Sequence, residues 1–180
     1  MKLLSPKTDV SRPIIDRVKE SLFSVLYKYD LPDGKIVADL FCGVGSLGLE
    51  ALSRGAKLVT FVEKDPNIVA TLETNIEKAG FLKESKVILA DAFKIGAPVN
   101  EQPYDLVFVD PPYADTSEIG DGSPLSDLMA ILTNRLAPHG TVVVRTRKNI
   151  QLPEQYGQFH VIERRQWGTM AVTILQKTNK

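Results

Sequence analysis

The chain has 180 residues, 43% of them hydrophobic, and its 22 basic and 22 acidic side chains give a formal net charge of zero. This length suffices for one full hydrophobic core, so we expect a single domain over residues 1–180. The balanced charge excludes a strongly basic, nonspecific nucleic-acid binder. Neither a membrane span of roughly 20 apolar residues nor a secretory signal pattern is found, so the expected location is the cytoplasm.

Cysteine and histidine are scarce: the sequence holds one cysteine, Cys42, and two histidines, His139 and His160. A single cysteine excludes an internal disulfide, and these residues do not have the spacing of metal ligands. We therefore expect chemistry without a metal. Cys42 has no histidine nearby in sequence to activate it, so we do not expect it to act as a nucleophile.

The charge is unevenly distributed along the chain. Residues 1–28 carry a net charge of +3 and residues 145–180 carry +5, which leaves −8 for residues 29–144. If the two ends fold onto one face, they form a positive surface suited to the phosphates of a nucleic acid. Ordinary solvated surface charge is the alternative interpretation.

The hydrophobic pattern predicts an α/β fold. Apolar residues recur at helical spacing over about 14–29, which predicts an amphipathic helix that ends before Pro32. Short β-branched runs then alternate with amphipathic stretches, as in a mostly parallel, doubly wound sheet whose ligands bind beyond the carboxyl ends of the strands. The predicted strands are 36–41, 58–62, 87–89, 106–109 and 141–144, and the predicted helices are 46–54, 66–79 and 124–136.

The end of the chain departs from this alternation. Two strand-like runs, 159–162 and 170–175, have no helix between them and predict an antiparallel C-terminal hairpin. The stretches 93–103 and 113–123 contain Gly and Pro and follow strand ends. We expect both to be loops beside the active site.

A glycine motif follows the first predicted strand. Gly43, Gly45 and Gly48 satisfy the pattern Gly-x-Gly-x-x-Gly between a strand and a helix, which is typical of a nucleotide-type ligand. We expect a tight turn at Gly43, close approach of the ligand at Gly45 and close helix–strand packing at Gly48.

Three carboxylates near strand ends indicate which ligand this is. Glu63 ends the second strand, where it can accept hydrogen bonds from ribose hydroxyls. Asp39 precedes the glycines, where it would repel a pyrophosphate but attract the cationic amino-acid part of S-adenosylmethionine. Asp91, followed by Ala92, can accept from the adenine amino group. For each acid, a helix N-cap or a surface charge is the alternative.

The fourth predicted strand ends in Asp110-Pro111-Pro112-Tyr113, where the prolines fix the backbone. An exocyclic base amine is a poor nucleophile because its lone pair is delocalised into the ring. The Asp110 carboxylate and the Pro111 carbonyl can accept its two N–H groups, while Tyr113 stacks on a base flipped out of its stack. The segment therefore predicts methyl transfer to a base amine, and a purely structural strand end is the alternative.

These segments resemble the RsmD-type ribosomal RNA guanine-N2 methyltransferases, which have the class I Rossmann-like methyltransferase fold. The Asp-Pro-Pro-Tyr tetrapeptide is shared with adenine-N6 enzymes, so the block 12–23 supplies the specificity. The sequence departs from the family in its short N-terminus, without Gly- and Arg-rich strands, and in Gln-Trp-Gly-Thr at 166–169 in place of Tyr-Gly-Asp-Thr. The resemblance covers most of the chain and rests on 12–23, 39–51, 61–63, 91–92 and 105–113.

The resemblance implies S-adenosylmethionine as cofactor, S-adenosylhomocysteine as product, and a guanine of 16S rRNA in an assembling small subunit as target. It also implies that a helical segment at about 12–29 caps the cofactor pocket, and the expected state is a monomer. The candidate catalytic residues are Asp110, Pro111, Pro112 and Tyr113. The candidate cofactor-binding residues are Asp39, Phe41, Gly43, Gly45, Gly48, Glu63, Lys64, Asp91, Ala92 and Asp110, and the candidate RNA-binding residues are Arg12, Arg17, Lys19, Arg145 and Arg147.

Other functions stay open at this point. An adenine-N6 methyltransferase acting on RNA or DNA shares the catalytic tetrapeptide. A dinucleotide-dependent enzyme shares the glycine motif but not the need for Asp39. A noncatalytic RNA-binding module would keep the pocket and bind the cofactor without methyl transfer.

Overall fold

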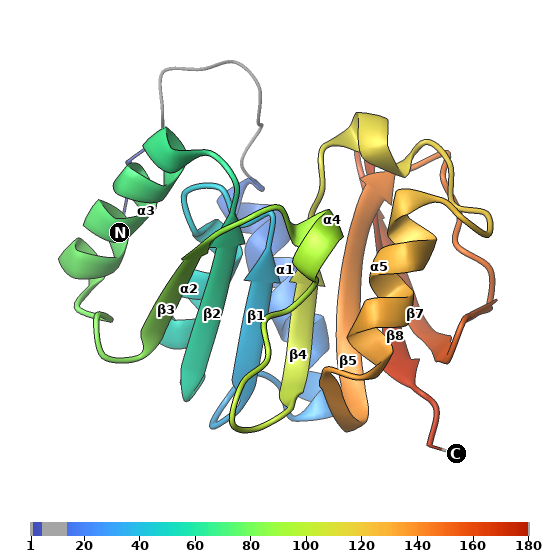
Figure 1. Cartoon of the computed structure of the whole chain (residues 1–180), viewed down its shortest axis with the longest axis horizontal. Coiled ribbons are helices and arrows are strands. Elements are labelled where there is room, and N and C mark those ends of the chain that lie inside the picture. Colours follow the sequence, from blue (N-terminus) through green and yellow to red (C-terminus); the bar gives the residue numbers. More distant parts are fainter. Residues whose placement is uncertain (1, 5–13, 180) are drawn as a thin grey trace.

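The computed structural model describes residues 2–4 and 14–179, and these contain one mixed sheet with the strand order β3-β2-β1-β4-β5-β8-β7-β6 (Figure 1). The pairs β1–β2, β1–β4, β2–β3 and β4–β5 are parallel, whereas β5–β8, β7–β8 and β6–β7 are antiparallel. The predicted α/β fold and its antiparallel C-terminal hairpin are confirmed. The strands are β1 (Ile36–Leu40), β2 (Leu58–Glu63), β3 (Ser85–Leu89), β4 (Tyr104–Val109), β5 (Leu136–Arg147), β6 (Gln155–Tyr156), β7 (Phe159–Trp167) and β8 (Met170–Lys177).

Helices cover both faces of the sheet and create two hydrophobic cores. The apolar sides of α1, α2 and α3 pack on one face, where Phe23 of α1 lies 5.8 Å from Phe108 of β4 between ring centroids. The helix α5 packs on the other face through buried leucines. Figure 1 shows α5 and α4 in front of the sheet and α1 and α2 behind it. The helices are α1 (Asp16–Leu26), α2 (Ser46–Ser53), α3 (Pro66–Ala79), α4 (Ala92–Ile95) and α5 (Pro124–Thr133), with short 3-10 helices η1 (Tyr27–Tyr29) and η2 (Tyr113–Thr116).

Several element boundaries differ from the sequence prediction. The last long helix ends at Thr133 and not at 136, and β5 spans Leu136–Arg147 and not only 141–144. The turn of the C-terminal hairpin lies at Gly168 and Thr169, because the polar run 164–166 continues β7 by main-chain pairing with β8. Polar side chains do not prevent this pairing, which uses only backbone groups.

The two stretches predicted as loops contain short helices. Residues 93–103 include most of α4, and residues 113–123 include η2. The short strand β6 was not predicted. Elements this short have no hydrophobic periodicity of their own, so their conformation depends on contacts with neighbouring parts of the structure.

The loops that form the site lie at one edge of the sheet. The parallel strands β1, β2, β4 and β5 all end at this edge, at the top of Figure 1. The turn after β1 has a left-handed backbone at Phe41, Gly43 and Gly45, with φ of 59°, 54° and 92°. Phe41 is not a glycine, so its conformation stores strain of the kind that clusters at functional sites.

Candidate active site

A cavity of about 830 Å³ opens at the carboxyl edge of the sheet. Its walls differ in charge. The ends of β1, β2 and β3 contribute Asp39, Glu63 and Asp91, whereas the end of β5 contributes Arg145 and Arg147. This asymmetry fits a cationic ligand at the first wall and an anionic or acceptor-rich ligand at the second.

The glycine turn has the predicted position between β1 and α2. Gly43 lines the cavity in a left-handed turn, and Gly48 packs so closely on β2 that an added Cβ would lie 2.3 Å from the Phe61 ring. Gly45 is not among the residues that line the cavity, and an added Cβ there would lie 2.5 Å from the Leu72 side chain of α3. Close approach of a ligand to the backbone of Gly45 stays a prediction.

Asp39 is a buried carboxyl group at the base of the cavity. It is 1% exposed and accepts a hydrogen bond of 2.8 Å from the backbone N–H of Gly48. Its pKa is raised to about 8, mainly by burial and to a smaller extent by the neighbouring carboxylates of Asp110 and Glu63, while the Gly48 hydrogen bond opposes the shift. A cation beside Asp39 would therefore favour its charged form.

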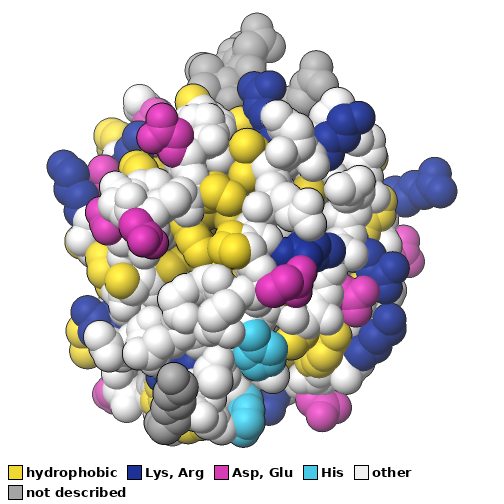
Figure 2. Space-filling view, turned by 90° about the vertical axis from the view of Figure 1, so that its right-hand side faces the viewer, with side chains coloured by type: hydrophobic (Ala, Val, Ile, Leu, Met, Phe, Trp, Pro, Cys, Tyr) yellow, Lys and Arg dark blue, Asp and Glu magenta, His cyan; other side chains and the backbone are white. Residues whose placement is uncertain are grey.

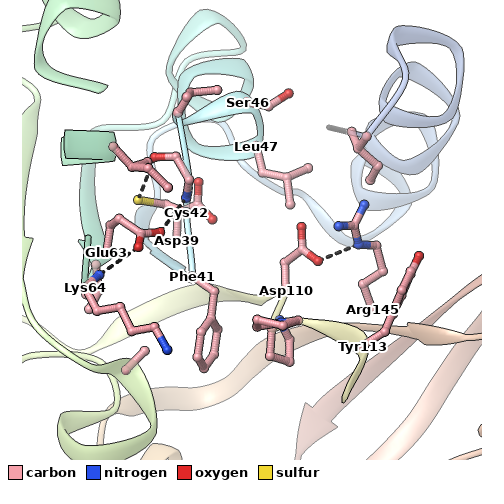
Figure 3. Close-up of a pocket in the computed structure, with 18 of the residues that line it drawn as sticks. Asp39, Phe41, Cys42, Ser46, Leu47, Glu63, Lys64, Asp110, Tyr113 and Arg145 are labelled. Carbon is pink, nitrogen blue, oxygen red and sulfur yellow. Dashed lines mark hydrogen bonds and ion pairs between the residues drawn. The ribbon is translucent and has the colours of Figure 1, made fainter. Parts of the chain in front are cut away.

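Glu63 is held rigidly where β2 ends. Its carboxylate accepts from the backbone N–H groups of Gly43 at 3.1 Å, Lys64 at 2.8 Å and Asp65 at 3.0 Å (Figure 3). Three such bonds fix both oxygens and leave acceptor capacity for a ligand hydroxyl. Lys64 lines the cavity and is exposed.

Asp91 follows β3 at the same wall of the cavity. It is the N-cap of α4 and accepts from the backbone N–H of Phe93 at 3.0 Å, and it also lines the cavity together with Ala92. The ring of Phe41 lies 4.6 Å from that of Phe93 and adds an apolar surface to this wall. A carboxylate next to flat apolar groups suits a heterocycle with an exocyclic amine.

At the opposite wall, Asp110 forms an ion pair with Arg145, whose Nε donates to Asp110 Oδ1 (Figure 3). Both side chains are largely buried, at 17% and 15% exposure. Burial raises the pKa of Asp110, and the charge and hydrogen bond of Arg145 oppose that rise. Pro111, Pro112 and Tyr113 also line the cavity, and the guanidinium groups of Arg145 and Arg147 lie 5.7 and 5.3 Å from the Tyr113 ring centroid.

The five candidate RNA-binding residues have different surroundings. Arg17 and Arg147 are exposed, and Arg145 lies inside the cavity. The Nζ of Lys19 lies 3.4 Å from Asp16, 3.6 Å from Glu50 and 3.3 Å from Ser46 Oγ, and its side chain is only 11% exposed. Lys19 therefore joins α1 to α2, and contact of this residue with RNA stays a prediction. Arg12 lies outside the described residues.

Sequence reasoning missed several residues of the cavity. Ile14, Lys148, Asn149 and Thr169 line it. Three of these follow the carboxyl end of β5 or lie in the β7–β8 turn, so the rule that strand ends converge on the site could have identified them. Ile14 was not named as a site residue, but it lies in the segment 12–29 that the resemblance implies caps the pocket.

Cys42 is buried, and burial raises its pKa well above the ordinary value. A thiol of this kind is a poor nucleophile. In the parts of the chain that the structure describes, no three His, Cys, Asp or Glu side chains form a group suited to a metal ion. None of the described helices is long and apolar enough to cross a membrane.

Comparison with known proteins gives one family. The model of the family described as "Conserved hypothetical protein 95" matches residues 1–176. The chain is 32% identical over 174 residues to a putative rRNA methyltransferase, YlbH, of Bacillus subtilis, covering 93% of this chain and 88% of the relative. It is 35% identical over 149 residues to ribosomal RNA small subunit methyltransferase D of Haemophilus influenzae, covering 81% and 74%.

A solved structure agrees with these matches. A putative methyltransferase, yhhF, from Escherichia coli superimposes with a TM-score of 0.81 at 26% identity, covering all of this chain and 93% of the other. The chain therefore belongs to the Conserved hypothetical protein 95 family, which is the RsmD-type methyltransferase family that its motifs resemble.

Proposed function

We propose that this protein transfers a methyl group from S-adenosylmethionine to the exocyclic N2 of a guanine in small-subunit ribosomal RNA. The observation that carries the proposal is that one cavity joins the buried Asp39 to the Asp110–Tyr113 segment. The names of the relatives, which include ribosomal RNA small subunit methyltransferase D, support rRNA as the substrate. Because ribosomes assemble there, the cytoplasm is the proposed place of action.

The first wall of the cavity fits the cofactor part by part. Asp39 is a buried carboxyl group that would accept the ammonium of the methionine moiety. Glu63, fixed by three backbone N–H groups, would accept from the ribose hydroxyls. Asp91 and Phe41 would hold the adenine, one by its amino group and the other by its ring. Ile14, just before α1, lines the cavity and supports the proposal that the segment 12–29 covers part of this pocket.

The second wall fits a flipped base. When bound, the cofactor supplies an electrophilic methyl group on a sulfonium. Asp110 and the Pro111 carbonyl would accept the N–H groups of the base amine and direct its lone pair at that methyl. The Asp110 carboxylate would take the proton that the nitrogen must lose on gaining the methyl group, and S-adenosylhomocysteine would leave. Tyr113 would stack on the base.

The test is to incubate the purified protein with radiolabelled S-adenosylmethionine and small-subunit particles from cells that lack it. We expect N2-methylguanosine when the labelled nucleoside is identified by mass spectrometry. N6-methyladenosine would instead make the protein an adenine methyltransferase. Cofactor binding with no labelled nucleoside in any RNA or DNA would make it a binding module.

A variant tests the assignment of Asp110. Asp110→Ala should lower kcat by about 100-fold or more because the base amine loses its acceptor, while cofactor affinity stays within a few fold. Near wild-type turnover would contradict the mechanism. Glu63→Ala serves as the comparison, since it should weaken cofactor binding through the ribose.

A further inference from the structure

Arg145 has an unusual position for a basic residue in a protein that acts on nucleic acid. It projects from the end of β5 into the cavity, is 15% exposed, and its Nε donates to Asp110 (Figure 3). One Nη lies 3.7 Å from the sulfur of Met170. A guanidinium has five N–H donors, and only Nε and this Nη have protein partners among the described residues. Arg145 can therefore donate further hydrogen bonds inside the cavity.

The hydrogen-bonding edge of guanine fits this pair of side chains. Along that edge, guanine presents the N2 amine and N1–H as donors, followed by O6 as an acceptor. A charged carboxylate offers two acceptor oxygens, and a guanidinium beside it offers a donor. Adenine presents its amine next to an N1 acceptor, which would face a carboxylate oxygen unfavourably.

We propose that Arg145 selects guanine: it donates to O6 and holds Asp110 as a charged acceptor for N1–H and the N2 amine. This inference rests on the proposed function, since it assigns the base specificity of the same site. Under it, Arg145 contacts the substrate base directly and also positions the Asp110 carboxylate. The positive charge of the C-terminal segment suggests a role in binding RNA phosphates, but the burial of Arg145 beside Asp110 argues against that role for this residue.

The electrostatics of the pair support the proposal. Burial alone would favour a neutral Asp110, whose pKa is raised, and Arg145 is the group that opposes this rise. Without Arg145, a neutral carboxyl group would present an O–H where N1–H needs an acceptor. The ring of Tyr113, 5.7 Å from the Arg145 guanidinium, restricts the position of that group.

The test compares two unmethylated RNA substrates that differ only at the target position. One carries guanine there, and the other carries 2-aminopurine. 2-Aminopurine keeps the N2 amine but lacks both O6 and N1–H. We expect the wild-type protein to prefer guanine in kcat/KM by about 10- to 100-fold, as for loss of hydrogen bonds to charged groups. In Arg145→Met, this preference should fall to within about threefold. An unchanged preference in Arg145→Met would overturn the proposal.

Arg164→Met is the matched control. Arg164 is also a partly buried arginine that pairs with a carboxylate, Glu154, but it does not line the cavity. Its substitution should leave the preference for guanine unchanged. A general loss of stability would lower both rates and leave their ratio unaltered, so the ratio separates selection from folding.

If Arg145→Met does not fold, as judged by its melting temperature, Arg145→Leu, which also lacks an N–H donor, is measured in the same way. Two outcomes with the wild-type protein also decide the proposal. A wild-type protein that methylates both RNAs equally well overturns the role of Arg145 while leaving the proposed function intact. A wild-type protein that forms only N6-methyladenosine overturns both.

Discussion

At the scale of the residue, the site is made by carboxyl groups that the fold keeps out of water. Asp39 is the clearest case, because its burial raises its pKa to about 8 and its one described hydrogen bond comes from a backbone N–H. Burying the charged form of this group is costly, and a cation beside it offsets that cost. Cofactor binding should therefore change the protonation of Asp39, and this change can be measured.

We predict that cofactor binding releases protons from Asp39. Because the folded-state pKa is raised, the carboxyl group is mostly protonated at pH 7, and a bound ammonium lowers that pKa. Roughly one proton should be released per bound cofactor at pH 7, and affinity should rise as the pH increases from about 6 to about 8. Isothermal titration calorimetry in buffers with different ionisation heats measures the released protons.

Asp39→Asn provides the comparison, since its amide oxygen can still accept from Gly48. This variant should bind S-adenosylmethionine at least about tenfold more weakly, without proton release and with a flat pH dependence. If the wild type and Asp39→Asn release equal numbers of protons, Asp39 is not the group that receives the ammonium.

At the scale of the element, the turn after β1 and the helix α2 are positioned by packing on β2. Gly48 permits this packing because an added Cβ would lie 2.3 Å from Phe61 and 2.9 Å from Val59. Its backbone N–H also donates to Asp39, so Gly48 links α2 to the wall of the cavity that contains Asp39.

Gly48→Ala should therefore lower the free energy of unfolding by about 1–3 kcal/mol, as expected for overpacking a core. Denaturant titration followed by circular dichroism measures this change. Gly120→Ala is the matched control, because an added Cβ there has nothing within 4 Å and its φ is not in the left-handed region. Equal effects of the two substitutions would show that α2 shifts freely on β2.

At the scale of the whole molecule, acidic and basic side chains lie on different walls of the cavity at one edge of the sheet. The exposed Arg147 and Lys148 line the cavity at the carboxyl end of β5. Figure 2 shows Lys and Arg side chains along the top and the right-hand side of the face that it views. This arrangement favours phosphate contacts near Arg147 and Lys148 despite a net charge of zero.

Replacing both Arg147 and Lys148 by Ala should weaken RNA binding and reduce the slope of log affinity against log salt by about 1.4, or about 0.7 for each phosphate that is no longer neutralised. Fluorescence anisotropy over a range of salt concentrations measures this slope. The double variant Lys57→Ala/Lys83→Ala removes two exposed lysines that precede β2 and β3, at the opposite edge, and should leave the slope unchanged. If both double variants have the same slope, Arg147 and Lys148 do not bind phosphates.

Features that depend on neighbours along the chain could be predicted from the sequence. The glycine turn, the strand-to-proline junction at Asp110 and the helix 66–79 are of this kind, because backbone geometry and short-range periodicity specify them. The carboxyl ends of the parallel strands then had to converge, which predicted that Asp39, Glu63, Asp91 and Asp110 would share a site. All four line the cavity.

Only the folded structure shows which charged side chains form ion pairs with other parts of the chain. Lys19 is held by Glu50, 31 residues away in sequence, and Arg145 by Asp110, at a separation of 35 residues. Gly45 packs on Leu72 of α3. A sequence pattern shows that a residue is basic or small, but its partner is set by how distant elements pack, and burial then decides its pKa and its role.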